Sequence, residues 1–133
     1  MIVGTGVDIV EVDRIRRAVE RHGDRFTRRI FTDAEVGYCR RCVDPAQRFA
    51  TRFAAKEAAL KALGTGWREG VRFVEVEVSN DPLGAPTVTL SGRTLDLGRR
   101  LGVERIHVSL THHRDFAIAH VIMESLAQSP DGS

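Results

Sequence analysis

The chain has 133 residues and a mass of 14.8 kDa, with 42% hydrophobic and 29% charged residues and a net charge of +2. These proportions exclude wholesale disorder and a fibrous repeat, and the length suits one domain with one core. No apolar run approaches the roughly 20 residues that span a bilayer, and the N-terminus lacks the pattern of a secretory signal. Together with only two cysteines, these features predict a soluble, cytoplasmic protein.

The first predicted element is a strand over residues 1–12. Val7 and Ile9 lie on one face of this strand, whereas Gly4 and Gly6 share the other face with Asp8. Glycine lets a backbone or a ligand come close, and a carboxylate in an apolar strand is costly unless it is paired or binds a cation. Asp8 is therefore a candidate metal ligand, with an arginine ion pair or a solvated strand end as the alternatives.

A helix over residues 12–22 follows and ends at Gly23. Arg14, Arg17 and Arg21 are spaced by three and four residues, so they lie on one face of this helix. The segment that spans positions 10 to 61 carries 13 basic and 8 acidic residues, so the basic excess belongs to the N-terminal half. This pattern indicates an anionic partner, and the alternative is a solvated helix face without a function.

Two further helices carry signals at their ends. Thr32 and Glu35 form a capping box for a helix near residues 33–43. Pro45 opens a long helix that Gly64 closes, which is the usual asymmetry of proline at the start and glycine at the end.

The long helix contains a candidate acidic site. Its apolar stripe predicts the side that faces the core and consists of Phe49, Phe53, Leu60 and Leu63. Glu57 lies at the margin of this stripe, one turn before Lys61, and the only other lysine is Lys56. We expect the alanines beside Glu57 to form a low floor that leaves room for a ligand; they are Ala50, Ala54 and Ala58. The alternative is a surface ion pair of Glu57 and Lys61 worth about 0.3 kcal/mol.

Beyond residue 70 the hydrophobic period changes to two. The pattern predicts strands over 74–78 and 88–90, a helix over 94–101, and strands over 106–111 and 116–123 around a turn at 112–115. Residues 125–133 lack apolar support and are predicted to form a flexible tail. We therefore predict a single α+β domain over residues 1–124, with an antiparallel sheet and a long central helix.

Short motifs add little when they are taken alone. Gly64, Thr65 and Gly66 follow a helix instead of leading into one, so they do not form a Walker loop. Cys39 and Cys42 lack a second pair of ligands, which favours core cysteines over a zinc site. The adjacent histidines of the last predicted turn suit either phosphate binding or an exposed turn without a function.

Three segments are more informative together than any of them is alone. Asp8 lies in GVDIVEVDRI, Glu57 in RFAAKEAALKALGTG, and Ser109 and His112 in VSLTH. With RIFTDAEVGYC, the LGAP turn and HVSLTHHRDFAIAHVI, these motifs cover nearly the whole chain. In this order the sequence resembles the holo-acyl-carrier-protein synthases, the short type of 4′-phosphopantetheinyl transferase, and the two longest motifs are highly specific. The resemblance implies the 4′-phosphopantetheinyl transferase fold.

The resemblance also implies a reaction. Enzymes of this family transfer the phosphopantetheine arm of coenzyme A to a serine of an apo carrier protein in fatty acid biosynthesis, and they release adenosine 3′,5′-bisphosphate. By resemblance, Asp8 and Glu57 bind Mg²⁺, whose octahedral oxygen coordination needs only one or two carboxylates beside substrate phosphates. Lys61 then neutralises phosphate charge and completes the catalytic set. The serine proton goes to Glu57 or to a water on the metal, of which we favour the water.

Binding surfaces follow from the same resemblance. It assigns contacts with coenzyme A to Arg48, Arg52, Lys61, Gly64, Thr65, Gly66 and His112. It also makes the face of Arg14, Arg17 and Arg21 the docking surface for an acidic apo acyl carrier protein or carrier domain. Family members are homotrimers whose active sites lie between subunits, and the role of His113 stays open.

Two other classes of protein compete with this interpretation. A nucleic-acid-binding module would suit the arginine-rich helices, but Tyr38 and Trp67 are isolated and the net charge is modest. A redox protein or scaffold built around Cys39 and Cys42 is a weaker alternative. We therefore expect neither a nucleic acid nor a membrane as a partner.

Overall fold

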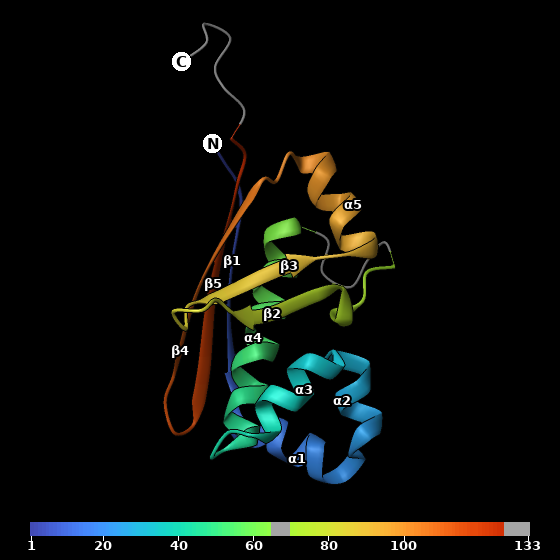
Figure 1. Cartoon of the computed structure of the whole chain (residues 1–133), viewed down its shortest axis with the longest axis vertical. Helices are drawn as coiled ribbons and strands as arrows, with labels where there is room; N and C mark the ends of the chain where they lie inside the picture. The colour runs from blue at the N-terminus through green and yellow to red at the C-terminus, as the bar shows by residue number, and fades with distance from the viewer. Residues whose placement is uncertain (65–69, 127–133) are drawn as a thin grey trace, which may run out of the picture.

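The structure is a computed structural model that describes residues 1–64 and 70–126. The elements are β1 (Ile2–Glu11), α1 (Val12–His22), α2 (Asp24–Ile30), α3 (Asp33–Arg40), α4 (Pro45–Leu63), the 3₁₀ helix η1 (Phe73–Glu75), β2 (Val76–Asn80), β3 (Pro86–Leu90), α5 (Gly92–Leu101), β4 (Arg105–His112) and β5 (Phe116–Glu124). Figure 1 shows α4 beside the long strands, with the β2–β3 hairpin across it and α1 to α3 gathered at one end. The predicted α+β class with a long central helix is confirmed.

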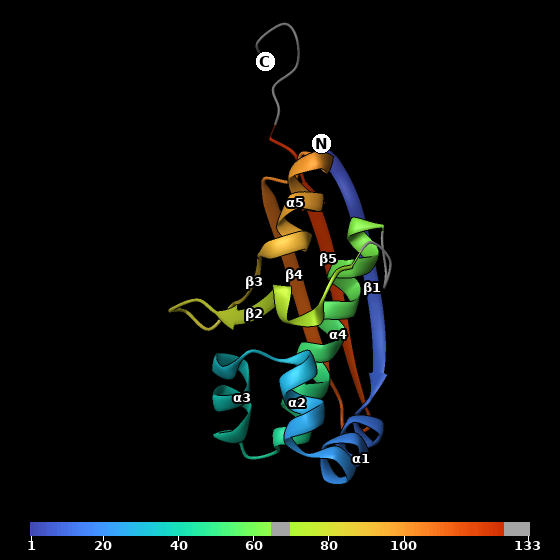
Figure 2. The ribbon, with the colours of Figure 1, turned by 90° about the vertical axis from the view of Figure 1, so that its right-hand side faces the viewer.

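The five strands form two antiparallel sheets rather than one. The larger sheet has the order β1-β5-β4, and the smaller one is the β2–β3 hairpin. Asp8 pairs in register with Ala119, which pairs with Leu110, so these three residues form one row across the larger sheet. In the view of Figure 2, α4 lies between the hairpin and β1.

The glycines of β1 admit the backbone of α4. A Cβ atom at Gly4 would overlap the carbonyl oxygen of Ala62, and one at Gly6 would overlap that of Ala58. The close approach expected from these glycines is therefore confirmed, and the neighbour is a helix backbone. Because side chains alternate along a strand, Asp8 is on the same face as the glycines and is directed towards α4.

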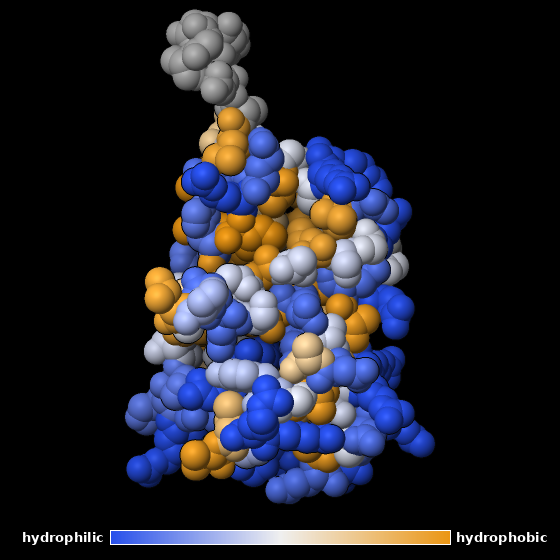
Figure 3. Space-filling view, in the orientation of Figure 1, coloured by the Kyte–Doolittle hydropathy of each residue, from blue (hydrophilic) through white to orange (hydrophobic). Residues whose placement is uncertain are grey.

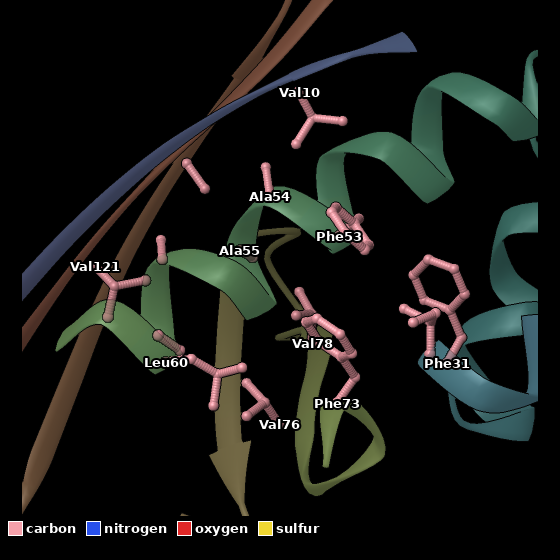
Figure 4. Packing of buried hydrophobic residues seen from close by; sticks show 14 of the residues in the cluster. Val10, Phe31, Phe53, Ala54, Ala55, Leu60, Phe73, Val76, Val78 and Val121 are labelled. Carbon is pink, nitrogen blue, oxygen red and sulfur yellow. The ribbon is translucent and has the colours of Figure 1, made fainter. Parts of the chain in front are cut away.

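The alanine face of α4 corrects one expectation. Ala50, Ala54 and Ala58 are fully buried, so this face is filled by protein and leaves no floor for a ligand. The apolar stripe behaves as predicted, since Phe49, Phe53, Leu60 and Leu63 are all in the core. Figure 4 shows the two sides of this core, with Val10 and Val121 on the sheet and Phe31 and Phe73 beyond the helix.

Local signals place most of the helix ends. Thr32 and Glu35 form the expected capping box of α3, Asp44 caps α4 through the backbone N–H of Gln47, and Gly64 ends α4 in the left-handed region at a φ of 78°. The region before β2 differs from the prediction, because residues 73–75 form η1 and only Val76 to Asn80 are a strand. Helix α2 has no counterpart among the predicted elements.

A buried ion pair joins α3 to α4. The ammonium of Lys56 lies 2.7 Å from the carboxylate of Glu35, and the two side chains are 0% and 1% exposed. Lys56 also donates to the carbonyls of Phe73 and Val76, while the second carboxylate oxygen of Glu35 accepts from the N–H of Val78. These bonds tie two helices to η1 and β2, where no water replaces a lost partner.

The two ends of the described chain lie together. The amine of Met1 donates to the carbonyl of Ser125 at 2.8 Å, directly after β5 ends at Glu124. Residues 127–133 of the predicted tail lie outside the described residues. Within the described ranges, no helix combines the length and the apolar composition that crossing a bilayer requires.

Candidate functional site

Asp8 and Lys61 meet where β1 crosses the C-terminal half of α4. The ammonium of Lys61 donates to Oδ1 of Asp8 and to the carbonyl of Val7, each at 3.0 Å. The side chain of Lys61 is 52% exposed, whereas that of Asp8 is 13% exposed. The contact therefore lies at the rim of the core, where a ligand from solvent reaches the lysine.

Glu57 belongs to the same group. Burial raises the pKa of its carboxyl above the ordinary value, the negative charge of Asp8 raises it further, and Lys61 and Arg14 lower it. Two partly buried carboxylates that repel each other form a place where a cation is stabilised. We call Asp8, Glu57 and Lys61 the acidic site.

The donor set of the acidic site fits Mg²⁺. Among the described residues, no group of three or more histidine, cysteine, aspartate or glutamate side chains could hold a metal ion. A zinc or calcium cage is therefore not present in the described part of the chain. Magnesium commonly binds one or two carboxylates and takes its other ligands from water and substrate phosphates, which is what Asp8 and Glu57 can offer.

A second group of predicted residues lies in a depression of about 510 Å³ between α3, α4, the β2–β3 hairpin and β4. Arg48, Arg52 and His112 line it, and Ser109 lies beside them. We call these three basic residues the basic site. Arg52 is only 3% exposed, has no carboxylate partner among the described residues, and leaves its buried Nε without a hydrogen bond. A buried arginine without a counter-charge is costly, so the basic site is suited to an anionic ligand.

The acidic and basic sites lie on opposite sides of α4. At about 100° per residue, Arg52 is about 140° and Arg48 about 180° around the helix from Glu57. The sheet separates them as well, since Asp8 is on the edge strand β1 and His112 on the edge strand β4. The two edges are two strand spacings apart, about 10 Å. The structure thus brings the predicted residues together as two groups and not as one.

The three arginines of α1 form an exposed face. Arg14, Arg17 and Arg21 line a shallow depression of about 610 Å³ on this helix. Arg16 is different, because it points elsewhere and pairs with Asp44 at 3.3 Å. Arg14 is close enough to Glu57 to lower the pKa of that carboxyl, so the arginine face borders the acidic site. Figure 3 shows hydrophilic side chains over much of the end of the molecule that α1 to α3 form.

Other predicted residues are placed as follows. Gly64 ends α4 three residues after Lys61, whereas Thr65 and Gly66 lie outside the described residues. Cys39 is a free thiol in the core, as expected, whereas Cys42 is a half-buried free thiol that lies beyond the end of α3 and outside the core. Sequence reasoning missed the contact of Tyr38 with Arg52, whose guanidinium carbon lies 4.0 Å from the centre of the tyrosine ring. No local signal relates residues on two different helices.

Comparisons with known proteins agree with this architecture. The family model described as the 4′-phosphopantetheinyl transferase superfamily matches residues 4–121. A holo-[acyl-carrier-protein] synthase of Solibacter usitatus is 51% identical over 125 residues, which cover 94% of this chain and 100% of the relative. One of Vibrio cholerae is 47% identical over 124 residues, which cover 93% of this chain and 98% of the relative.

Solved structures lead to the same family. The crystal structure of the Neisseria meningitidis synthase has a TM-score of 0.85 and 36% identity, and the match covers 94% of this chain and 100% of that one. The synthase of Helicobacter pylori in complex with coenzyme A has a TM-score of 0.79 and 32% identity, with coverage of 90% and 99%. The chain therefore belongs to the 4′-phosphopantetheinyl transferase superfamily and, within it, to the holo-acyl-carrier-protein synthases.

Proposed function

We propose that the protein transfers the 4′-phosphopantetheine arm of coenzyme A to a serine of an apo acyl carrier protein in fatty acid biosynthesis, in the cytoplasm. The serine oxygen forms a bond to the phosphorus that carries pantetheine. The bond from this phosphorus to the other half of the pyrophosphate breaks, and adenosine 3′,5′-bisphosphate leaves. The observation that carries the proposal is the acidic site, in which two carboxylates and a lysine from distant segments meet.

Mg²⁺ would be held by Asp8 and Glu57 and would neutralise negative charge on the pyrophosphate. The hydrogen bond from Lys61 to Asp8 orients that carboxylate and keeps a positive charge at the rim of the site, where phosphate oxygens arrive. The serine proton goes to a water that Glu57 orients, and direct transfer to Glu57 is the alternative. Glu57 rather than Asp8 has this role because Asp8 is already bound by the lysine.

The basic site would bind the 3′-phosphate of coenzyme A. In this proposal the pyrophosphate of coenzyme A binds at the acidic site, on the other side of α4. The arginines of the basic site therefore bind the other phosphate group of coenzyme A, which is the 3′-phosphate. Arg52 supports this assignment, because its guanidinium is buried without a counter-charge. Arg48 and His112 line the same depression and add donors for phosphate oxygens.

We propose a homotrimer in which each active site combines the acidic site of one subunit with the basic site of the next. One helix separates these sites within a single chain, so a second copy supplies the missing half. The sheet face turned away from α4 is suited to the contact, because it exposes Val7 at 57%, Ile9 at 60%, and Phe116 and Ile118 beside them. Gel filtration with light scattering tests the assembly, and a monomer that transfers the arm would contradict it.

The arginine face of α1 would dock the acidic carrier protein. Because it borders the acidic site, a carrier bound there brings its serine towards Glu57. Opposite charges on two partners raise the rate of association, and salt screens these charges. An association rate that stays constant between low and high salt would contradict this assignment.

Mass spectrometry of an apo carrier protein after incubation with the enzyme, coenzyme A and Mg²⁺ tests the reaction. We expect a gain of about 340 Da on one serine, as phosphoryl-type transfer of the arm requires. Glu57→Gln and omission of Mg²⁺ should each abolish the gain. An unchanged carrier mass with the wild-type enzyme would refute the proposed function.

A further inference from the structure

We propose that Tyr38 is a positioning residue that holds Arg52 in the orientation that binds the 3′-phosphate. Tyr38 thereby makes the enzyme prefer coenzyme A to dephospho-coenzyme A. The inference rests on the proposed function, because it assigns the phosphate at the basic site. It goes further by giving substrate selection to a residue of α3 for which sequence patterns indicate no function.

Arg52 lacks the partners that usually hold a buried arginine. Its side chain is 3% exposed, and none of the described carboxylates lies within ion-pair distance. The nearby carboxylate of Glu35 is already taken by Lys56 at 2.7 Å. Glu77 lines a neighbouring depression with Arg52, and its carboxylate already accepts a hydrogen bond from the hydroxyl of Thr32 at 2.6 Å. An anionic ligand at the basic site would supply the missing charge.

The ring of Tyr38 packs against the guanidinium of Arg52. The guanidinium carbon lies 4.0 Å from the ring centre, which is a cation–π contact. The ring face is not a side-chain hydrogen-bond acceptor of the usual kind, so this contact leaves N–H donors of the guanidinium for a ligand. Tyr38 and Arg52 line the same depression as Arg48 and His112. The ring therefore orients the donors without competing with the ligand for them.

Fixing this arginine matters because its long side chain otherwise loses several rotamers when it binds a ligand. A planar guanidinium binds phosphate through two parallel hydrogen bonds, which need a defined orientation. Dephospho-coenzyme A has the same pyrophosphate and pantetheine arm but no 3′-phosphate. Loss of the ring should therefore weaken the binding of only those substrates that carry this phosphate.

Steady-state kinetics with coenzyme A and dephospho-coenzyme A test the inference on the full-length enzyme and an apo carrier protein. For Tyr38→Leu we expect the KM for coenzyme A to rise about five- to tenfold, the effect of losing a partly buried cation–π contact. The kcat and the KM for dephospho-coenzyme A should stay within twofold of wild type. Tyr38→Phe keeps the ring and should restore the low KM for coenzyme A.

A second variant guards against loss of folding in the first. Arg52→Lys keeps the charge but removes the planar group that lies over the ring, so it should reproduce the selective rise in KM. The combination Tyr38→Leu/Arg52→Lys should be no worse than Arg52→Lys alone, because the ring acts through the arginine.

The outcomes separate the inference from the proposed function. If Tyr38→Leu raises the KM for both substrates equally, or lowers kcat alone, Tyr38 is only a packing residue and the inference is overturned. If the wild-type enzyme uses both substrates equally well, the phosphate is not read at this site and the inference also falls. Failure of the wild-type enzyme to modify the carrier at all would instead refute the proposed function.

Discussion

Replacing Lys56 by methionine should destabilise the protein more than any change at its exposed charges. The ammonium of Lys56 is fully buried and is bound by Glu35 and by the carbonyls of Phe73 and Val76. Methionine fills a similar volume but leaves the carboxylate of Glu35 buried without a counter-charge. The backbone N–H groups of Thr32 and Val78 still donate to that carboxylate, so its desolvation is compensated only in part.

Breaking a buried ion pair by removing one partner costs about 3–5 kcal/mol. In a chain of this length, 1 kcal/mol corresponds to about 4 °C in Tm, so we expect a fall of roughly 12–20 °C. Removing both charges in Lys56→Met/Glu35→Gln should cost less than the sum of the two single changes, by about 2 kcal/mol. The reason is that neither partner is then left charged and unpaired.

Urea unfolding at pH 7 measures these differences, at one fixed protein concentration because assembly contributes to apparent stability. The matched control is Lys61→Met, since Lys61 is half-exposed and pairs with Asp8 at the rim of the core. This control should lose no more than about 1 kcal/mol. If Lys56→Met costs as little as Lys61→Met, or if the two single changes add up, the buried pair does not tie α3 to α4 as we infer.

Three further predictions concern packing, thiol chemistry and docking. Gly6→Ala should lower the free energy of unfolding by about 1–3 kcal/mol and remove most transferase activity, because the new methyl group pushes α4 away from β1. Gly37→Ala serves as the control in unfolding and activity assays, because the atom nearest to its new methyl group is 3.5 Å away. At pH 8, iodoacetamide should label Cys42 but not Cys39 in the folded protein, as peptide mass spectrometry would show. Burial raises the pKa of Cys39 from 9.0 to about 12. The stability that its neutral thiol contributes should therefore be lost as the pH rises from the lower to the higher of these two values. Cys39→Ala should flatten that part of the stability profile, and a profile identical to wild type would exclude this cause. Arg17→Glu should lower kcat/KM for the carrier protein at low salt and leave the KM for coenzyme A unchanged; a loss that persists equally at high salt would argue against charge steering.

The helix ends were predictable because their signals are local. A capping box joins Thr32 to Glu35 over three residues, and Gly64 closes the same helix that Pro45 opens. Each signal depends on the backbone groups of one helical turn, so it needs no knowledge of the rest of the fold. Helix α2 was missed since no side chain caps its first turn and it begins directly after Gly23, which also ends α1.

Residue spacing alone indicates which type of site to expect. Gly4, Gly6 and Asp8 alternate along one strand, and Glu57 and Lys61 lie one turn apart on one helix, whatever the tertiary fold. These spacings predict a strand that tolerates a close neighbour and an acidic side chain that lies beside a cationic one. Combined with the family resemblance, they were sufficient to choose the residues of the acidic site.

The contacts that those residues make depend on the packing of distant elements. Lys61 reaches Asp8 across 53 positions of sequence, and Arg52 lies over the ring of a tyrosine of another helix. The alanines beside Glu57 are fully buried, although their spacing suits an open floor equally well. Short-range patterns specify which face of an element is apolar, but the partner of that face depends on how distant elements pack. This packing also places the two halves of the proposed active site on opposite sides of α4.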